Sequence, residues 1–445
     1  MRERLRRNAA GRLVLLLLVT LPMLLAFLLP AGSVAGAIWF WLLALGTVLL
    51  IWTVMGRPAD EDIPAFTGPR RLTPEDQPPT VGRVLAVDEG MEMPPGVRIF
   101  RGRLREDADR AFADLKKEMG SDTVAMLQQQ GEGRTAVVLL PKPVEEATLE
   151  RPVRPWLHWL LFGLTFLTTT FAGAAHQGVN LLRDPGLFAI GLPYSTALLA
   201  ILGFHELGHY FTARYHGMHV TPPFFIPVPF ALGTFGAFIQ MRSQAENRRA
   251  LFDVAIAGPL AGLVVAIPAL YFGLKSSAIL PAGSSMLDGM RGSLSQTSIL
   301  MSVIAEASLR DAIGPGEALR LSPLAFAGWL GLLVTALNLI PVGQLDGGHI
   351  ARALFGTRAG AVVSSVAMMS LFFLALFVWP GLMMWAIIVF FMAGRGTPPL
   401  NDVSQLPLGR KLLAVAAFVI LALILIPMPS GMGSPSSADL RCPYV

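Results

Sequence analysis

Long apolar segments recur along most of this chain, with the length of membrane-spanning helices. They lie at roughly 13–30, 34–55, 155–175, 187–211, 251–273, 323–345, 361–379, 381–394 and 411–427. A helix needs roughly 20 apolar residues to cross the hydrocarbon core of a bilayer. The pattern therefore predicts a polytopic α-helical membrane protein of about eight or nine spans. The two segments on either side of Trp379 and Pro380 are the shortest.

A polar stretch, residues 56–152, separates the second apolar segment from the third. Residues 56–80 are rich in Pro, Asp, Glu and Arg and resemble a linker, whereas residues 81–143 carry the patterns of a folded unit. The elements that we expect there are a strand at 97–104, a helix at 106–119 and a hairpin formed by 124–129 and 135–140. We therefore expect a small soluble α+β domain with a scaffolding or regulatory role.

Residues 220–245 interrupt the apolar helical pattern after the fourth segment. A proline-rich run excludes a regular helix there, and the residues after it alternate around Gly233 and Gly236. We expect a re-entrant hairpin or loop that returns into the membrane. An exposed strand edge in it would suit pairing with an extended substrate. The alternative is a loop on the membrane surface with no role in substrate binding.

Composition and charge agree with the membrane class. Hydrophobic residues make up 53% of the chain and charged residues 15%. Arginines precede the first apolar segment, and further basic residues fall on the same side if the spans alternate, which predicts a cytoplasmic N-terminus and a cytoplasmic 56–152 unit. The net charge of +5 then follows from topology, and no basic-aromatic pattern indicates nucleic-acid binding.

The first apolar segment, at 13–30, has two interpretations. The segment resembles a signal peptide, but a second span follows almost at once, so we favour a retained transmembrane hairpin over residues 1–55. The single cysteine, Cys442, lies in the predicted external tail and permits neither an intrachain disulfide nor a thiolate cluster.

The segment 187–211 contains three ionisable residues, His205, Glu206 and His209. Such groups are costly at bilayer depth and usually functional. Positions i and i+4 share one face of a helix, so both imidazoles can bind one ion. The H-E-x-x-H pattern is that of zinc proteases, in which the glutamate is the general base.

A catalytic zinc usually has three protein ligands, so a third must come from elsewhere in the chain. Asp346 is the best candidate, because Pro341 and nearby glycines break the 323–345 segment just before it. Segments 187–211 and 323–345 run in the same direction across the membrane, and both place their polar motifs near the interior end. By itself, Asp346 would be interpreted as a turn residue. Metal binding is favoured because it is expected at the same membrane depth as the two histidines.

The remaining parts of a hydrolytic site follow from chemistry. Glu206 would take a proton from the attacking water and pass it to the leaving amine. Asn338, shortly before the helix break, is a candidate donor to the oxyanion. A hydrogen bond between helices is an equally good explanation for this asparagine. His349 is a candidate partner of Asp346 or an ordinary helix residue, and His216 and His219 are expected to be solvated.

These motifs resemble the site-2 protease family of intramembrane zinc metalloproteases. The likeness is closest to the plastid-type and bacterial branch related to ethylene-dependent gravitropism-deficient and yellow-green proteins. It rests on His205–His209, Gly233–Ala237, Ala257–Gly262, Gly328–Leu332 and Thr335–Gly347, and it covers roughly residues 97–360.

The resemblance implies that His205, His209 and Asp346 bind Zn²⁺, that Glu206 is the catalytic acid and base, and that Asn338 lines the cleft. It also implies that the hairpin at 230–242 presents substrate, and that the substrates are transmembrane or membrane-anchored proteins. No PDZ module is evident in the 274–322 loop, although some bacterial relatives carry one, so substrate filtering would fall to other parts of the chain.

The sequence therefore predicts four regions. They are an N-terminal transmembrane hairpin (1–55), a linker with the soluble domain (56–152), an intramembrane metalloprotease core (153–360), and C-terminal transmembrane helices with a tail (361–445). We expect a bacterial cytoplasmic membrane protein. Two alternatives remain, a non-proteolytic zinc-binding scaffold or chaperone and a metal transporter. A retained general base argues against the first, and the absence of a paired repeat argues against the second.

Overall fold

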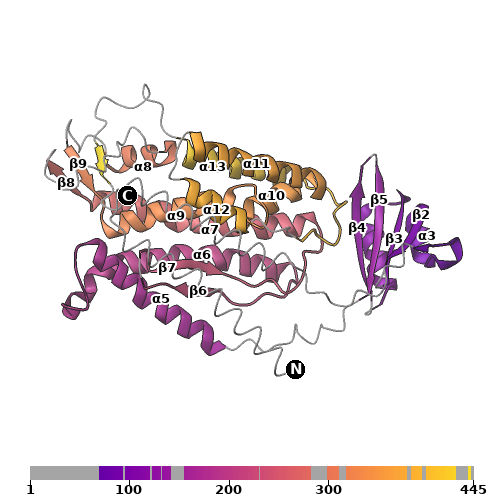
Figure 1. Ribbon diagram of the computed structural model, residues 1–445, viewed down its shortest axis with the longest axis horizontal. Helices are drawn as coiled ribbons and strands as arrows, with labels where there is room; N and C mark the ends of the chain where they lie inside the picture. The colour runs from indigo at the N-terminus through magenta and orange to yellow at the C-terminus, as the bar shows by residue number, and fades with distance from the viewer. Residues whose placement is uncertain are drawn as a thin grey trace, which may run out of the picture. The chain divides into compact units, whose positions relative to one another are not determined.

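The computed structural model describes residues 70–93, 96–120, 123–131, 133–141, 155–229, 231–281, 298–309, 317–377, 382–392, 397–426 and 439–441. The predicted hairpin at 1–55 and the beginning of the linker lie outside these residues. The described parts comprise a five-stranded sheet with its helices and a larger set of apolar helices that enclose a strand pair (Figure 1).

The soluble unit is an antiparallel sheet with strand order β1-β2-β3-β5-β4. Its strands are β1 (Arg70–Arg71), β2 (Leu85–Met93), β3 (Val97–Leu104), β4 (Thr123–Gln130) and β5 (Arg134–Pro141). A 3₁₀ turn (Pro74–Asp76) and two helices, α3 (Pro79–Val84) and α4 (Ala108–Glu118), complete the unit. The sheet buries a core against α4 through Ala111, Phe112 and Leu115, the apolar face that helical spacing predicts.

The predicted strand, helix and hairpin of this unit are all present, but the sequence pattern missed β1, α3 and β2. Strand β2 pairs along its length with β3, so the order is β-α-β-β-α-β-β rather than β-α-β-β. Its sequence contains Asp88, Glu89 and Glu92, which hide the apolar alternation, and its register shifts between Val87 and Glu89. Such a bulge breaks the two-residue period on which recognition of a strand depends.

Five helices among the described residues are long and apolar enough to cross a membrane. They are α5 (Pro155–His176), α6 (Leu192–Tyr215, after a 3₁₀ turn at Pro185–Gly191), α7 (Arg248–Lys275), α11 (Thr357–Phe377) and α13 (Leu408–Leu425). The chain therefore has the character of a polytopic membrane protein. In the predicted segment 323–345 the helix, α9 (Pro323–Leu339), ends early, and α10 (Asp346–Phe355) begins just after the segment. Helix α12 (Leu382–Met392) is shorter than a full span.

Helices α6, α7 and α9 pack directly against one another at the centre of the apolar part. Small residues permit this close approach. A Cβ on Gly208 would lie 2.5 Å from the Ala257 carbonyl oxygen, and one on Gly328 would lie 2.4 Å from the Leu270 amide. The glycines of the sequence motifs are therefore required where two helix backbones touch.

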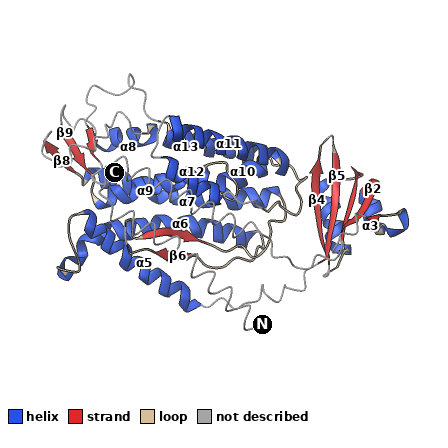
Figure 2. Ribbon diagram, in the orientation of Figure 1, coloured by secondary structure: helices blue, strands red, loops and turns tan. Residues whose placement is uncertain are grey.

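The proline-rich segment forms the predicted hairpin. Strands β6 (Phe224–Pro227) and β7 (Thr234–Phe238) pair antiparallel and lie between α5 and α6 (Figure 2). Phe162 of α5 packs edge-on against Phe225 of β6, with 5.2 Å between ring centroids. Among the described residues, β7 pairs with β6 along one edge and has no second strand neighbour.

The loop between α7 and α9 carries a helix and short strands. The helix is α8 (Ile299–Leu309). Strand β9 (Glu317–Arg320) pairs antiparallel with β8 (Ala278–Pro281) and parallel with β10 (Asp439–Arg441). A segment close to the end of the chain is thereby attached to this loop.

Residues 397–406, which we call the connector, join the soluble sheet to the helices. The amide of Leu127 in β4 donates to the Leu400 carbonyl at 2.7 Å, and the amide of Asp402 donates to the Leu127 carbonyl at 2.8 Å. The Leu400 amide also donates to the carbonyl of Ala245, just before α7. The connector therefore extends the sheet at β4 and also bonds to the start of α7.

Candidate metal centre

His205 and His209 lie one turn apart on α6, as the i, i+4 spacing predicts. Both are buried, with 4% and 5% of their surfaces exposed, and their Nε2 atoms lie 3.1 Å from each other. Two ring nitrogens this close to one another require either a shared proton or a cation between them.

Asp346 completes the cluster from a distant part of the chain. Its Oδ2 atom lies 3.3 Å from the Nε2 atoms of both His205 and His209. It is the first residue of α10, which begins after the turn through Pro341 and Gly343. Gly347 permits this turn, because a Cβ there would lie 2.0 Å from the Leu339 carbonyl oxygen. The helix break predicted from the sequence is thus what directs Asp346 toward the histidines.

The donor set fits a tetrahedral zinc ion. Within the described residues, these three side chains form the group of His, Cys, Asp or Glu that can hold a metal. Zinc binds imidazole and carboxylate at about 2.0–2.1 Å, which places neighbouring ligand atoms of a tetrahedron about 3.3 Å apart. The observed separations of 3.1, 3.3 and 3.3 Å match this value. Three protein ligands leave a fourth position for water or substrate, as in catalytic zinc sites.

Helix α7 supports the histidines from behind. The Nδ1 atom of His209 lies 2.7 Å from the Val254 carbonyl, which can only accept, so Nδ1 carries the proton and Nε2 presents its lone pair. Gly258 lies directly against the ring, because a Cβ there would be 2.1 Å from Nε2 of His209. The Ala257–Gly262 motif therefore shapes the metal centre as well as the helix contact.

Glu206 is buried next to the ligands, with 8% of its surface exposed. Its carboxylate interacts electrostatically with His209 and Asp346, and the backbone of Ile239 lies within hydrogen-bonding reach of it. Ile239 directly follows β7. The end of the hairpin therefore lies against the predicted general base.

Asn338 reaches the same cluster from α9. Its Nδ2 atom lies 3.2 Å from Nε2 of His205. The amide is therefore at the ligand triangle and within reach of a group bound there. His349 bonds through Nδ1 to the Leu345 carbonyl at 3.0 Å, the ordinary contact of a histidine within its own helix. No direct bond between His349 and Asp346 is present in the described part of the chain.

The expectation that His216 is solvated was wrong. Its Nε2 atom lies 3.0 Å from Asp253, which also binds Arg410 through two bonds of 2.7 Å. This network ties the ends of α6, α7 and α13 together. Sequence reasoning also missed Val254 and Ile239, because both act through the backbone and no side-chain signal marks them.

The comparisons with known proteins agree with this geometry. Residues 193–378 match the model of peptidase family M50. The chain is 30% identical to the probable zinc metalloprotease EGY1 of rice and to that of Arabidopsis thaliana, and 28% identical to EGY2 of Arabidopsis thaliana, all chloroplastic. Each match covers 74% of this chain and 60–66% of the relative, so the chain spans about three fifths of the length of these relatives. No solved structure matches the chain. The resemblance to the site-2 protease family is thus confirmed, and the segment that matches the peptidase family M50 model includes His205, His209 and Asp346.

Proposed function

We propose that this chain is an intramembrane zinc metalloprotease that hydrolyses peptide bonds in membrane-spanning or membrane-anchored proteins. The observation that carries this proposal is the triangle of His205, His209 and Asp346, whose edges fit zinc, with a buried carboxylate beside it. The names of the relatives, which are probable zinc metalloproteases, support it.

The chain's own residues have separable roles. His205, His209 and Asp346 hold the ion, which when bound supplies Lewis-acid catalysis and makes water nucleophilic near neutral pH. Glu206 accepts the proton of the attacking water and returns it to the leaving amine. The Asn338 amide donates a hydrogen bond to the carbonyl oxygen as negative charge develops on it.

The edge of β7 opposite β6 is suited to hold the substrate. A transmembrane helix must unwind before its peptide bonds can be attacked, and an unwound segment can pair with an exposed strand edge through backbone hydrogen bonds. Because Ile239 at the end of β7 lies against Glu206, a strand paired there passes beside the metal centre. The hairpin would then enter the membrane from the interior side.

The proposed setting is a cytoplasmic membrane of bacterial type, with the N-terminus and the 56–152 domain on the cytoplasmic side. The positive-inside pattern supports the orientation. The relatives are chloroplastic, so an organelle membrane is the other setting. The soluble domain acts in this proposal as a scaffold held against the protease core by the connector.

The test is cleavage of a model transmembrane substrate by the reconstituted protein, with Glu206→Gln as the central variant. The amide is nearly isosteric and cannot accept the proton, so cleavage should stop while zinc stays bound, as measured by elemental analysis. A variant that cuts as fast as the parent would show that Glu206 is not the base.

A second variant, His205→Ala, distinguishes the enzyme from the alternatives. It should lose both zinc and cleavage, because it removes a ligand. Zinc binding by the parent without any cleavage of transmembrane substrates would favour a metal-binding scaffold. Zinc movement across sealed vesicles would favour a transporter.

A further inference from the structure

The tip of the β6–β7 hairpin, of which residues 228–229 and 231–233 are described, is bonded to two different helices. Thr168 of α5 donates its hydroxyl to the Gly233 carbonyl at 2.7 Å. Tyr194 of α6, which is fully buried, donates its hydroxyl to the Leu232 carbonyl at 3.0 Å. These are side-chain bonds to the backbone of the tip, so they fix its position without depending on the side chains of the strands.

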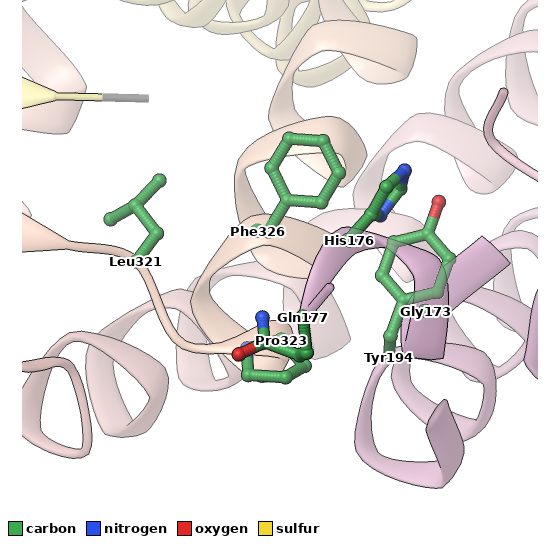
Figure 3. A pocket seen from close by; sticks show the side chains of 7 residues that line it. All are labelled: Gly173, His176, Gln177, Tyr194, Leu321, Pro323 and Phe326. Atoms are coloured by element: carbon green, nitrogen blue, oxygen red, sulfur yellow. The ribbon is translucent and has the colours of Figure 1, made fainter. Parts of the chain in front are cut away.

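A third contact holds the preceding tip residue. The ring of His176, the last residue of α5, lies within hydrogen-bonding reach of the Ala231 backbone. Figure 3 shows this ring beside Tyr194 and Phe326, with centroid distances of 5.2 and 5.0 Å. We call Thr168, His176 and Tyr194 the tip anchors.

The backbone of the tip is constrained as well as anchored. Ala231 has φ +51°, the single positive φ of a non-glycine residue in the part of the chain that the structure describes. Gly233 has φ +82°, and a Cβ there would lie 2.5 Å from the Thr169 Cα atom. A non-glycine residue in this region costs on the order of 1 kcal/mol and persists only where its surroundings hold it.

The other end of β7 lies at the metal centre, where the Ile239 backbone is within hydrogen-bonding reach of Glu206. Along α6, Tyr194 and Glu206 are separated by about 18 Å at 1.5 Å per residue. Along the strand, Leu232 and Ile239 are separated by at most about 23 Å at 3.3 Å per residue. The strand is long enough to cover this stretch of α6, so one segment can join the tip anchors to the metal centre.

We propose that the tip anchors set the register of β7 against the metal centre, and thereby select which peptide bond of a strand-paired substrate is cut. They are positioning residues, and the inference rests on the proposed function. A strand advances about 3.3 Å per residue and alternates its faces, so sliding β7 by one residue would bring a neighbouring bond to the metal centre.

The experiment uses Thr168→Val and Tyr194→Phe, which remove one hydroxyl each and keep the shape of the side chain. Each variant is reconstituted with a model transmembrane substrate, and the products are mapped by intact-mass spectrometry. The share of cleavage at the main bond should fall and that at adjacent bonds should rise. Total rate should fall by about two- to tenfold, the effect of one buried hydrogen bond, with zinc content unchanged.

Thr165→Val is the matched control. Thr165 is a buried threonine of the same helix, and its hydroxyl donates to the Leu161 carbonyl of α5 at 2.7 Å rather than to the hairpin. Its product pattern should equal that of the parent. A shift as large as that of Thr168→Val would mean that loosening α5, not releasing the tip, moves the cleavage site, and it would overturn the inference.

Two results separate this inference from the proposed function. Anchor variants that cut the same bonds in the same proportions as the parent, at whatever rate, overturn the register role and leave the protease intact. A parent that cuts no transmembrane substrate overturns the proposed function, and the register role with it.

Discussion

The metal centre and the connector are both buried polar clusters, yet they are built on opposite principles. His205 and His209 are 4% and 5% exposed, and Asn401 and Asp402 are 1% and 2% exposed, so burial does not distinguish them. The difference is in their hydrogen bonding.

In the connector, donors meet acceptors. Arg248 donates to one Asp402 oxygen at 2.9 Å, and the Thr357 amide donates to the other at 3.1 Å. The side-chain oxygen of Asn401 accepts from the amides of Val403 and Ser404. The side chains of Asn401 and Asp402 therefore have their partners within the protein and need no ligand.

In the metal centre, acceptors converge on one another. Since Nδ1 of His209 is directed to the Val254 carbonyl, Nε2 of the neutral ring is an acceptor, and it lies 3.1 Å from Nε2 of His205 and 3.3 Å from Oδ2 of Asp346. Such an arrangement is favourable only with a cation at its centre. Buried acceptors that face one another thus indicate a cation-binding site. Buried donors paired with acceptors indicate a structural contact.

The largest expected effect comes from removing one of the three converging acceptors of the metal centre. Asp346→Ala should weaken zinc binding by more than about 100-fold, the upper range for residues that only support a ligand. Without zinc, the variant should be no less stable than the parent, because removing this carboxylate leaves no donor without its acceptor. Elemental analysis and thermal unfolding in detergent measure the two quantities. Retention of zinc at the parent's affinity would remove Asp346 from the ligand set.

A change in the connector should have the reverse outcome, a loss of stability with zinc affinity unchanged. Asp402→Ala leaves the Arg248 side chain, 10% exposed, without its carboxylate, and should destabilise the fold by about 3 kcal/mol. The folded fraction should still bind zinc with parental affinity. Glu246→Gln is the control, because its ion pair with Lys116 is exposed and contributes less than about 1 kcal/mol. Equal unfolding free energies for the two variants would contradict the structural role.

Gly258→Ala tests the metal centre from the side of α7. The new Cβ must displace the His209 ring, so zinc affinity should fall by about 10- to 100-fold while the helices stay folded. Gly262→Ala is the matched control, because its Cβ would lie 3.4 Å from the nearest His205 atoms. We expect that variant to bind zinc almost as the parent does. Similar losses in both would indicate a general effect of helix spacing.

The smallest expected effect concerns the soluble domain. Hydrogen bonds from Arg83 and Thr80 lower the pKa of the Glu118 carboxyl. Its contribution to stability is therefore present above its unfolded pKa and lost as pH falls through the lowered folded value. Unfolding of the parent should become easier in that acidic range, and Glu118→Gln should reduce the dependence on pH. An unchanged pH profile in the variant would contradict this.

The prediction of the elements and of the residues that come together succeeded where local chemistry was sufficient. The i, i+4 spacing placed His205 and His209 on one face, and the turn at Pro341 and Gly343 indicated where a helix would end before Asp346. It failed where the contact is made by backbone, as at Val254, or where a strand is irregular, as at β2. The connector was also missed, because polar residues between two apolar segments have the appearance of an ordinary loop.

The sequence by itself determined the apolar helices, the two histidines, the adjacent glutamate and the presence of a hairpin, because each follows from a period or a backbone restriction within a few residues. The tertiary structure decided that Asp346 lies 3.3 Å from the histidines and that Asp402 binds Arg248. It also decided that side chains of α5 and α6 bond to the backbone of the hairpin tip. These contacts join residues far apart in the chain. They depend on how packed helices are shifted and rotated relative to one another, which the periodicity of apolar residues does not determine.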